Sequence, residues 1–318
     1  MTYNIQILIF ISLSFLYLFR RYPFAYYFIL SALITFMFPS LLLPQVTSQQ
    51  ILVNHSYYAS FALLSLLSAI VIPYSSMMLN FVIYSTMFSS LYIILTGVKY
   101  SVMLASSMDG MMIACAYPLI WRYSLNFQHI IKYAFRIIPI LGIFIVGGST
   151  GVGALCIFFF ILLARKYLLY AILSVVSILS VAYYFDPRLF NDSARIVCWV
   201  WSMEWWWNNA NVWFGTGFGT YLIIGPSIQI MTNNHVGNWY TFMHNDYLQV
   251  LFETGIIGLG ILLSFIATLL YRSRHCIYLF SSVLVYSACM VIYMPTRYVP
   301  TLLIASVIVK EIYGRRKV

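Results

Sequence analysis

Long apolar runs, separated by short polar or basic segments, dominate the chain. Runs such as 158–163 and 255–270 have no polar face that a helix could present to water. Apolar runs of this length predict transmembrane α-helices, because only a helix satisfies its own backbone hydrogen bonds inside lipid. The predicted spans are residues 3–19, 24–43, 57–73, 79–97, 101–121, 133–147, 150–164, 167–185, 247–271, 276–294 and 298–313.

The composition supports this interpretation and excludes a soluble globular protein. Hydrophobic residues make up 63% of the 318 residues and charged residues only 8%, whereas a soluble domain carries about 25% charged residues. We therefore predict an all-α fold, a polytopic transmembrane bundle of about eleven spans forming one integral membrane domain over residues 1–318. The net charge of +10 does not indicate a nucleic-acid partner, because most Lys and Arg lie between apolar runs, where cytoplasmic anchoring explains them.

The basic residues also predict an orientation. With eleven spans, 13 of the 17 Lys and Arg residues fall on one side, which the positive-inside rule assigns to the cytoplasm. The N-terminus is then outside and the C-terminus inside. The segment 133–164 leaves an alternative open: one long span with a glycine break would invert everything downstream, but the charge distribution favours two short helices.

One long segment, residues 186–246, then lies outside the membrane. It holds seven of the eight tryptophans, which argues against disorder, and loops of this length are usually functional or disordered. We expect one or two short interfacial helices around 193–208, followed by an irregular Gly- and Asn-rich stretch.

Within this loop, Arg195 lies about one helical turn from Trp199 and about three turns from Trp205 and Trp206. The pattern is typical of an aromatic belt at the lipid headgroups. It equally suits a binding surface, in which Trp stacks on sugar rings and Arg binds phosphate. The alternating glycines of "FGTGFGTY", residues 214–221, permit either a tight turn or a close approach to a ligand.

The stretch "FMHNDYLQVLFETGIIGL", residues 242–259, places His244 at the start of a helix that begins near Asn245. The helix macrodipole accounts for Asp246 in the first turn. It does not account for Glu253, two turns deeper, where an ionisable group is costly and suggests a function. An imidazole here suits proton transfer from a sugar hydroxyl, although a lone histidine on a loop is often merely structural.

These three elements together resemble a known family. The stretch "HNDYLQVLFETGIIGL", preceded by "FGTGFGTY" and by the arginine of "SARIVCW", is similar to the bacterial O-antigen ligase and O-antigen polymerase family. The similarity covers about residues 193–259. It implies a glycosyltransferase of the bacterial inner membrane, with its active face toward the periplasm. Such an enzyme moves a glycan from undecaprenyl pyrophosphate to an acceptor hydroxyl on another glycan or on the lipid A core, within membrane lipid and without metal or cofactor.

The resemblance also implies roles for individual residues. Arg195 would bind the pyrophosphate, and His244 would act as the base or position a substrate, so both are candidate catalytic residues. Where many relatives carry a Ser-Arg pair at a helix start, this chain has Ser149–Thr150, so Arg188 or Arg297 would supply the second cation. The remaining candidate substrate-binding residues are Asn245, Asp246, Glu253, Trp199, Gly217 and Gly219.

A polytopic transporter or lipid flippase is the alternative. Transporters place polar residues at mid-membrane depth, and here Asp109 lies within a predicted span. Most of the polar residues lie on one face, however, which favours the enzyme. The five cysteines show no metal-ligand spacing, and no metal site is predicted.

Overall fold

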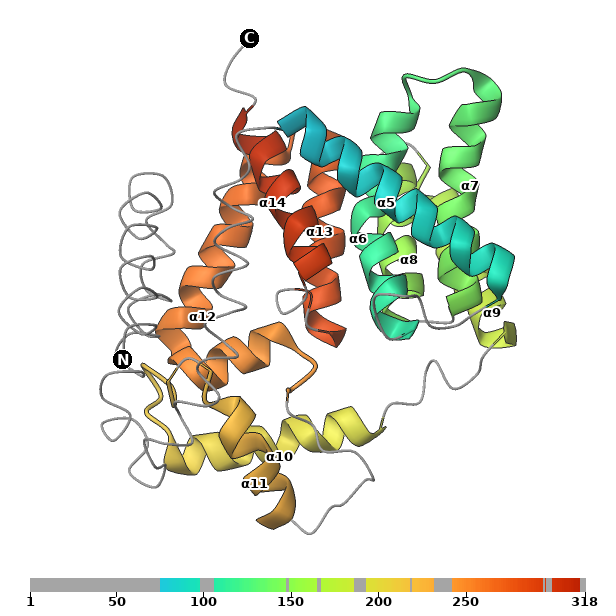
Figure 1. Cartoon of the computed structure of the whole chain (residues 1–318). Coiled ribbons are helices and arrows are strands. Elements are labelled where there is room, and N and C mark those ends of the chain that lie inside the picture. Colours follow the sequence, from blue (N-terminus) through green and yellow to red (C-terminus); the bar gives the residue numbers. More distant parts are fainter. Residues whose placement is uncertain are drawn as a thin grey trace, which may run out of the picture. The chain divides into compact units, whose positions relative to one another are not determined.

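The computed structural model describes residues 75–97, 106–146, 149–164, 167–185, 193–217, 219–231, 242–293, 295 and 299–314. Within these ranges every regular element is an α-helix, with only an isolated bridge between Asn211 and Gly215 and no β-strand (Figure 1). The prediction of an all-α chain is therefore confirmed for this part. The predicted spans 3–19, 24–43 and 57–73 lie outside the described residues, as do Arg188 and Arg297.

Each of the eight remaining predicted spans corresponds to one helix, with boundaries that differ by at most five residues. The segment 133–164 contains two helices, the first ending at Val146 and the second beginning at Ser149, as the charge pattern predicted. The helices are α5 (Ser75–Thr96), α6 (Ser106–Ser124), α7 (His129–Val146), α8 (Ser149–Ala164), α9 (Leu168–Phe185), α12 (Asp246–Ser273), α13 (Ile277–Ile292) and α14 (Val299–Gly314).

Three segments of the described chain are long and apolar enough to cross a membrane: Leu79–Thr96, His129–Val146 and Asp246–Ser273. Shorter apolar helices occupy Thr150–Ala164, Leu168–Ile178 and Ile277–Val291. The chain thus has the helices of a membrane protein, because length and apolar composition are what a bilayer demands of a spanning helix.

The chain folds into two compact units, divided near residues 193 and 265. In the larger unit, α6 packs against α7, α8 and α13, and α5 packs across α6 and α7 (Figure 1). Residues 109–120 of α6 are all buried, Asp109 among them. Small residues allow this close packing: a Cβ at Gly151 of α8 would lie 2.9 Å from the carbonyl oxygen of Gly110.

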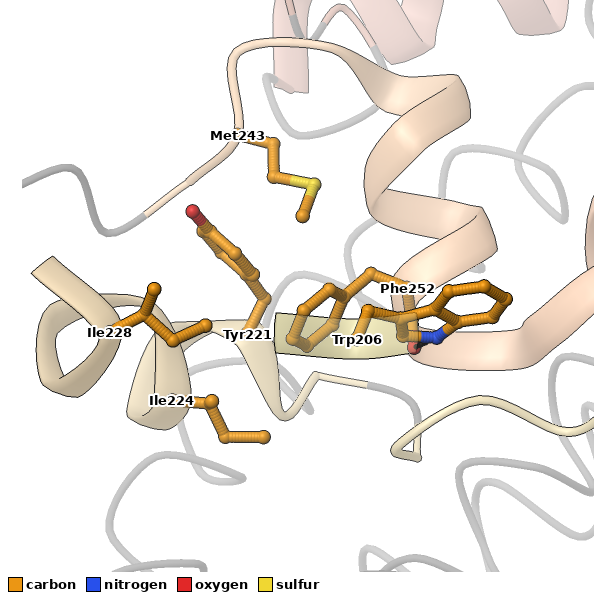
Figure 2. Close-up of a cluster of buried hydrophobic side chains, with 6 residues drawn as sticks. All are labelled: Trp206, Tyr221, Ile224, Ile228, Met243 and Phe252. Atoms are coloured by element: carbon orange, nitrogen blue, oxygen red, sulfur yellow. Dashed lines mark hydrogen bonds between the residues drawn. The ribbon is translucent and has the colours of Figure 1, made fainter. Parts of the chain in front are cut away.

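The smaller unit contains α10 (Ser193–Asn209), α11 (Tyr221–Met231) and the first part of α12. A cluster of buried side chains joins the three helices: Trp206, Tyr221, Ile224, Ile228, Met243 and Phe252 (Figure 2). Helix α10 lies where a short helix was predicted, and its interfacial position stays a prediction. Helix α11 falls in the stretch that we predicted to be irregular. Its Gly225 and Pro226 disfavour a helix locally. Burial of Ile224 and Ile228, one turn apart on the same face, outweighs that preference.

Candidate functional site

Helix α12 is interrupted at Gly255, which has φ +67° and ψ −169°. In an uninterrupted helix the N–H groups of Ile256 and Ile257 would donate to the carbonyls of Phe252 and Glu253. Here the break leaves those four backbone groups without partners inside the helix. Figure 1 shows the resulting bend in α12.

The loop that follows α10 supplies all four missing partners. Thr216 N–H donates to the Phe252 carbonyl at 3.0 Å, and Gly217 N–H donates to the Glu253 carbonyl at 2.8 Å. In the other direction, the N–H of Ile256 donates to the Val212 carbonyl at 3.0 Å, and that of Ile257 to the Trp213 carbonyl at 3.3 Å. Loop 211–217 and the bend of α12 therefore form one hydrogen-bonded unit.

This unit needs glycine on both sides. A Cβ at Gly215, where φ is +73°, would lie 2.5 Å from the backbone carbon of Glu253. A Cβ at Gly255 would lie 2.2 Å from the carbonyl oxygen of Trp213. Gly215 of the loop thus packs against the backbone of Glu253 and Thr254, and Gly255 of the helix against the backbone of Trp213 and Phe214, a close approach that the sequence analysis did not anticipate. Residues 211–217 form a turn, one of the two alternatives that the sequence left open, and the ligand-binding roles of Gly217 and Gly219, both buried here, stay predictions.

Side chains fix the same unit. Asn211 Oδ1 accepts hydrogen bonds from the N–H groups of Trp213 and Phe214 at 3.0 and 3.1 Å, which shapes the turn. The indole N–H of Trp206 on α10 donates to the Phe252 carbonyl at 3.1 Å. Trp205 stacks on the Phe252 ring, whose centroid lies 5.7 Å away. Two of the three consecutive tryptophans of α10 therefore hold the start of α12.

Helix α12 begins as predicted, immediately after Asn245. The Asn245 side-chain oxygen accepts a hydrogen bond from the Leu248 N–H at 3.0 Å, the geometry of an N-cap. Asp246 is the first helical residue and is buried, where the helix macrodipole favours its charge. These two residues bring His244 to the mouth of the helix, as the sequence analysis expected.

His244 has an unusual backbone conformation. Its φ of +53° makes it the only non-glycine residue with a positive φ in the described part of the chain. A left-handed conformation costs an ordinary residue roughly 1–2 kcal/mol and tends to persist at functional sites, where surrounding contacts enforce it. One such contact lies on the preceding residue. The indole N–H of Trp199 donates a short hydrogen bond to the carbonyl of Met243.

Arg195 and His244, 49 positions apart in the sequence, are close enough to interact. Burial first, and the positive charge of Arg195 second, lower the pKa of His244 to about 4 from an ordinary value of about 6.5. The imidazole is therefore neutral at physiological pH. The structure thus brings together the two candidate catalytic residues.

Glu253 is connected to the same loop. Its carboxylate is fully buried and accepts a hydrogen bond from Gln249 Nε2 at 2.9 Å. The Gln249 Oε1 in turn accepts from the Met243 N–H at 3.4 Å. The sequence analysis singled out Glu253 but missed Gln249. Its position four residues before Glu253, on the same helix face, was the signal that could have found it.

Tyr221, the first residue of α11, was also missed. Its hydroxyl lies 2.9 Å from Ser202 Oγ and 3.3 Å from Cys198 Sγ on α10, and its ring packs edge-on against Phe252. Burial is the largest effect that raises the pKa of Tyr221, so the phenol stays protonated. Its role in this arrangement is to join α10, α11 and α12 (Figure 2).

Among the described residues, no group of His, Cys, Asp and Glu has the arrangement of a metal site. Searches of family models, curated proteins and solved structures found no match to the chain.

Proposed function

We propose that the chain is a membrane glycosyltransferase that moves a glycan from undecaprenyl pyrophosphate to an acceptor hydroxyl. The observation that carries this proposal is the electrostatic interaction of Arg195 on α10 with His244, which lies two residues before the start of α12. A fixed cation beside a neutral imidazole is what this transfer needs: one group for the charge of the leaving diphosphate and one for the proton of the acceptor.

In the proposed reaction the acceptor oxygen attacks the anomeric carbon of the donor sugar. The bond from that carbon to the diphosphate oxygen breaks, and undecaprenyl pyrophosphate leaves with the bonding electrons. Its negative charge develops next to the guanidinium of Arg195, which can bind phosphate oxygens through two parallel hydrogen bonds. The hydroxyl proton of the acceptor passes to the imidazole of His244.

The low pKa of His244 makes donor binding part of this mechanism. A base with a pKa of about 4 is weak at pH 7, because proton transfer is most efficient when the pKa lies near the working pH. A bound diphosphate neutralises the charge of Arg195 and adds negative charge, and both effects raise the pKa of a nearby imidazole. His244 would then become an effective base only after the donor has bound.

We also propose the setting of the reaction. Eleven spans with the N-terminus outside place residues 186–246 and His244 on the periplasmic face of the bacterial inner membrane. The acceptor would be another lipid-linked glycan for a polymerase or the lipid A core for a ligase. The apolar helices and the distribution of Lys and Arg support this topology, and the resemblance to O-antigen ligases and polymerases supports the substrates.

The test is to replace Arg195 or His244 with Ala and to measure surface polysaccharide in cells that express each variant at the wild-type level. The matched controls are Arg274→Ala and His275→Ala, which remove an exposed Arg and His whose side chains are hydrogen-bonded to each other at 3.0 Å. We expect loss of long glycan chains in the first pair only. Loss of a polymerase leaves single repeats on the lipid core, whereas loss of a ligase leaves none. Normal glycan chains in both site variants would refute the proposal.

A further inference from the structure

The backbone of Met243, the residue before His244, is held from two sides. Its carbonyl accepts the hydrogen bond from the indole of Trp199 on α10, and its N–H donates to Gln249 Oε1 on α12. Met243 itself is 1% exposed. The Met243 carbonyl belongs to the peptide group that joins Met243 to His244, and the Met243 N–H lies one peptide group earlier, so both contacts restrain the backbone that leads into His244.

The orientation of the Gln249 amide follows from its other partner. Gln249 Nε2 donates to Glu253 Oε1 at 2.9 Å, so the end of the amide that faces Glu253 is the nitrogen. That leaves the amide oxygen toward Met243, where it meets a backbone donor. Glu253 thus determines that the oxygen of the Gln249 amide faces Met243, the residue before His244. Gln249 and Glu253 are both fully buried.

We propose that Gln249, oriented by Glu253, is a positioning residue that acts with Trp199 to hold the backbone of His244 in its left-handed conformation. The effect of this positioning on glycan transfer rests on the proposed function. Glu253 then contributes through Gln249, with no direct contact to substrate. Glu253, whose presence membrane packing did not explain, thus acts on the backbone before His244 through two successive hydrogen bonds, from Gln249 to Glu253 and from Met243 to Gln249.

We call the two hydrogen bonds that Trp199 and Gln249 make to the Met243 backbone the clamp. The clamp is needed because of the backbone conformation of His244. A non-glycine residue with a positive φ relaxes when the contacts that enforce it are removed. Deleting the hydrogen bond from Trp199 or the one to Gln249 leaves a single hydrogen bond to hold the backbone of Met243. A hydrogen bond of this kind shifts an equilibrium between closed and open loop by roughly tenfold, so each deletion should expose His244 measurably.

The first experiment measures that exposure without reference to activity. Diethyl pyrocarbonate modifies neutral imidazole, and with a pKa of about 4 His244 is neutral at pH 8, so its rate of modification reports accessibility. We compare Gln249→Met and Trp199→Phe with Trp201→Phe, which shortens another tryptophan of α10 in the same cluster. Mass spectrometry follows His244, with the exposed His275 as internal reference. We expect about tenfold faster modification of His244 in the first two variants only.

The second experiment exchanges the two side chains of α12. In Gln249→Glu, two carboxylates face each other across a distance at which only one can ionise easily. In Gln249→Glu with Glu253→Gln, the new carboxylate accepts from the Met243 N–H and from the new amide, so both hydrogen bonds return with the same net charge. We expect the single variant to lose most of its glycan synthesis, and the double variant to recover to within about threefold of wild type.

The outcomes separate the clamp from the proposed function. Unchanged reactivity of His244 in both Gln249→Met and Trp199→Phe would overturn the clamp. An inactive double variant with a normally protected His244 would overturn the indirect role of Glu253 and assign that carboxylate to the substrate. Faster modification in the clamp variants, combined with normal glycan in His244→Ala, would sustain the clamp and refute the proposed function.

Discussion

Replacing Gly255 with Ala tests the pairing of loop 211–217 with the bend of α12. The change adds one methyl group at a backbone position where φ is +67° and ψ is −169°, a region that essentially only glycine adopts. The added Cβ would lie 2.2 Å from the Trp213 carbonyl oxygen and 2.6 Å from the Phe214 nitrogen. Backbone atoms cannot rotate away as a flexible side chain could, so the loop must move.

The size of the effect follows from what that movement breaks. The strained backbone costs roughly 1–3 kcal/mol for a residue with a Cβ. Moving residues 212–213 lengthens the hydrogen bonds that their carbonyls accept from Ile256 and Ile257, at about 1 kcal/mol net for each. Together these amount to about 3–5 kcal/mol, which corresponds to a fall of roughly 5–10 °C in thermal midpoint.

The assay is thermal unfolding of the detergent-solubilised protein, followed by the loss of the monodisperse peak in size-exclusion chromatography. The matched control is Gly260→Ala, five residues further along α12, where an added Cβ meets nothing within 4 Å. Alanine in a helix is favoured over glycine by about 0.5–1 kcal/mol, so the control should be as stable as wild type or slightly more so. A Gly255→Ala midpoint within about 1 °C of wild type, or an equal fall in both variants, would refute the pairing.

Three further predictions concern other contacts. Gly215→Ala should lower the thermal midpoint by a similar amount, and combining it with Gly255→Ala should add little, because both changes separate loop 211–217 from the bend of α12. Arg195→Gln should raise the pKa of His244 above its value of about 4, since a positive neighbour is removed; the NMR titration of ¹³C-labelled histidine measures it, and an unchanged pKa would show that the two side chains are not close. Arg122→Gln and Glu311→Gln, which break a 3.0 Å ion pair between α6 and α14, should each cost about 0.5–1 kcal/mol. The double variant should cost little more than either alone, and additive losses would mean that the pair contributes nothing.

The helices could be predicted from the sequence because their causes are local. Apolar runs define α5 to α9 and α13, and Asn245 followed by Asp246 marks the start of α12 by N-cap and dipole preferences. The predicted proximity of Arg195 and His244 came from the resemblance alone. No periodicity connects two residues 49 positions apart.

The close packing of loop 211–217 against the bend at Gly255 could not be predicted, because Gly215 and Gly255 are each compatible with an ordinary turn when considered alone. Their partners are backbone groups, which carry no residue-specific signal. Gln249 was missed for a related reason: a glutamine in the second turn of a helix usually faces water, and only the tertiary position of Met243 shows that this one does not. Helix α11 was missed because the burial of Ile224 and Ile228 is a tertiary effect.

The bend at Gly255 also divides α12 into a short first part and a longer second part, and only the second part has the length of a membrane span. A straight helix from residue 246 to residue 273 would measure about 42 Å at 1.5 Å per residue, well beyond the hydrocarbon thickness of about 30 Å. The part after the bend, residues 256–273, measures about 27 Å by the same rule and matches that thickness closely. On the proposed topology, the bend lets the apolar segment fit the bilayer, while Asp246 and Glu253 stay in the turns before it, outside the hydrocarbon.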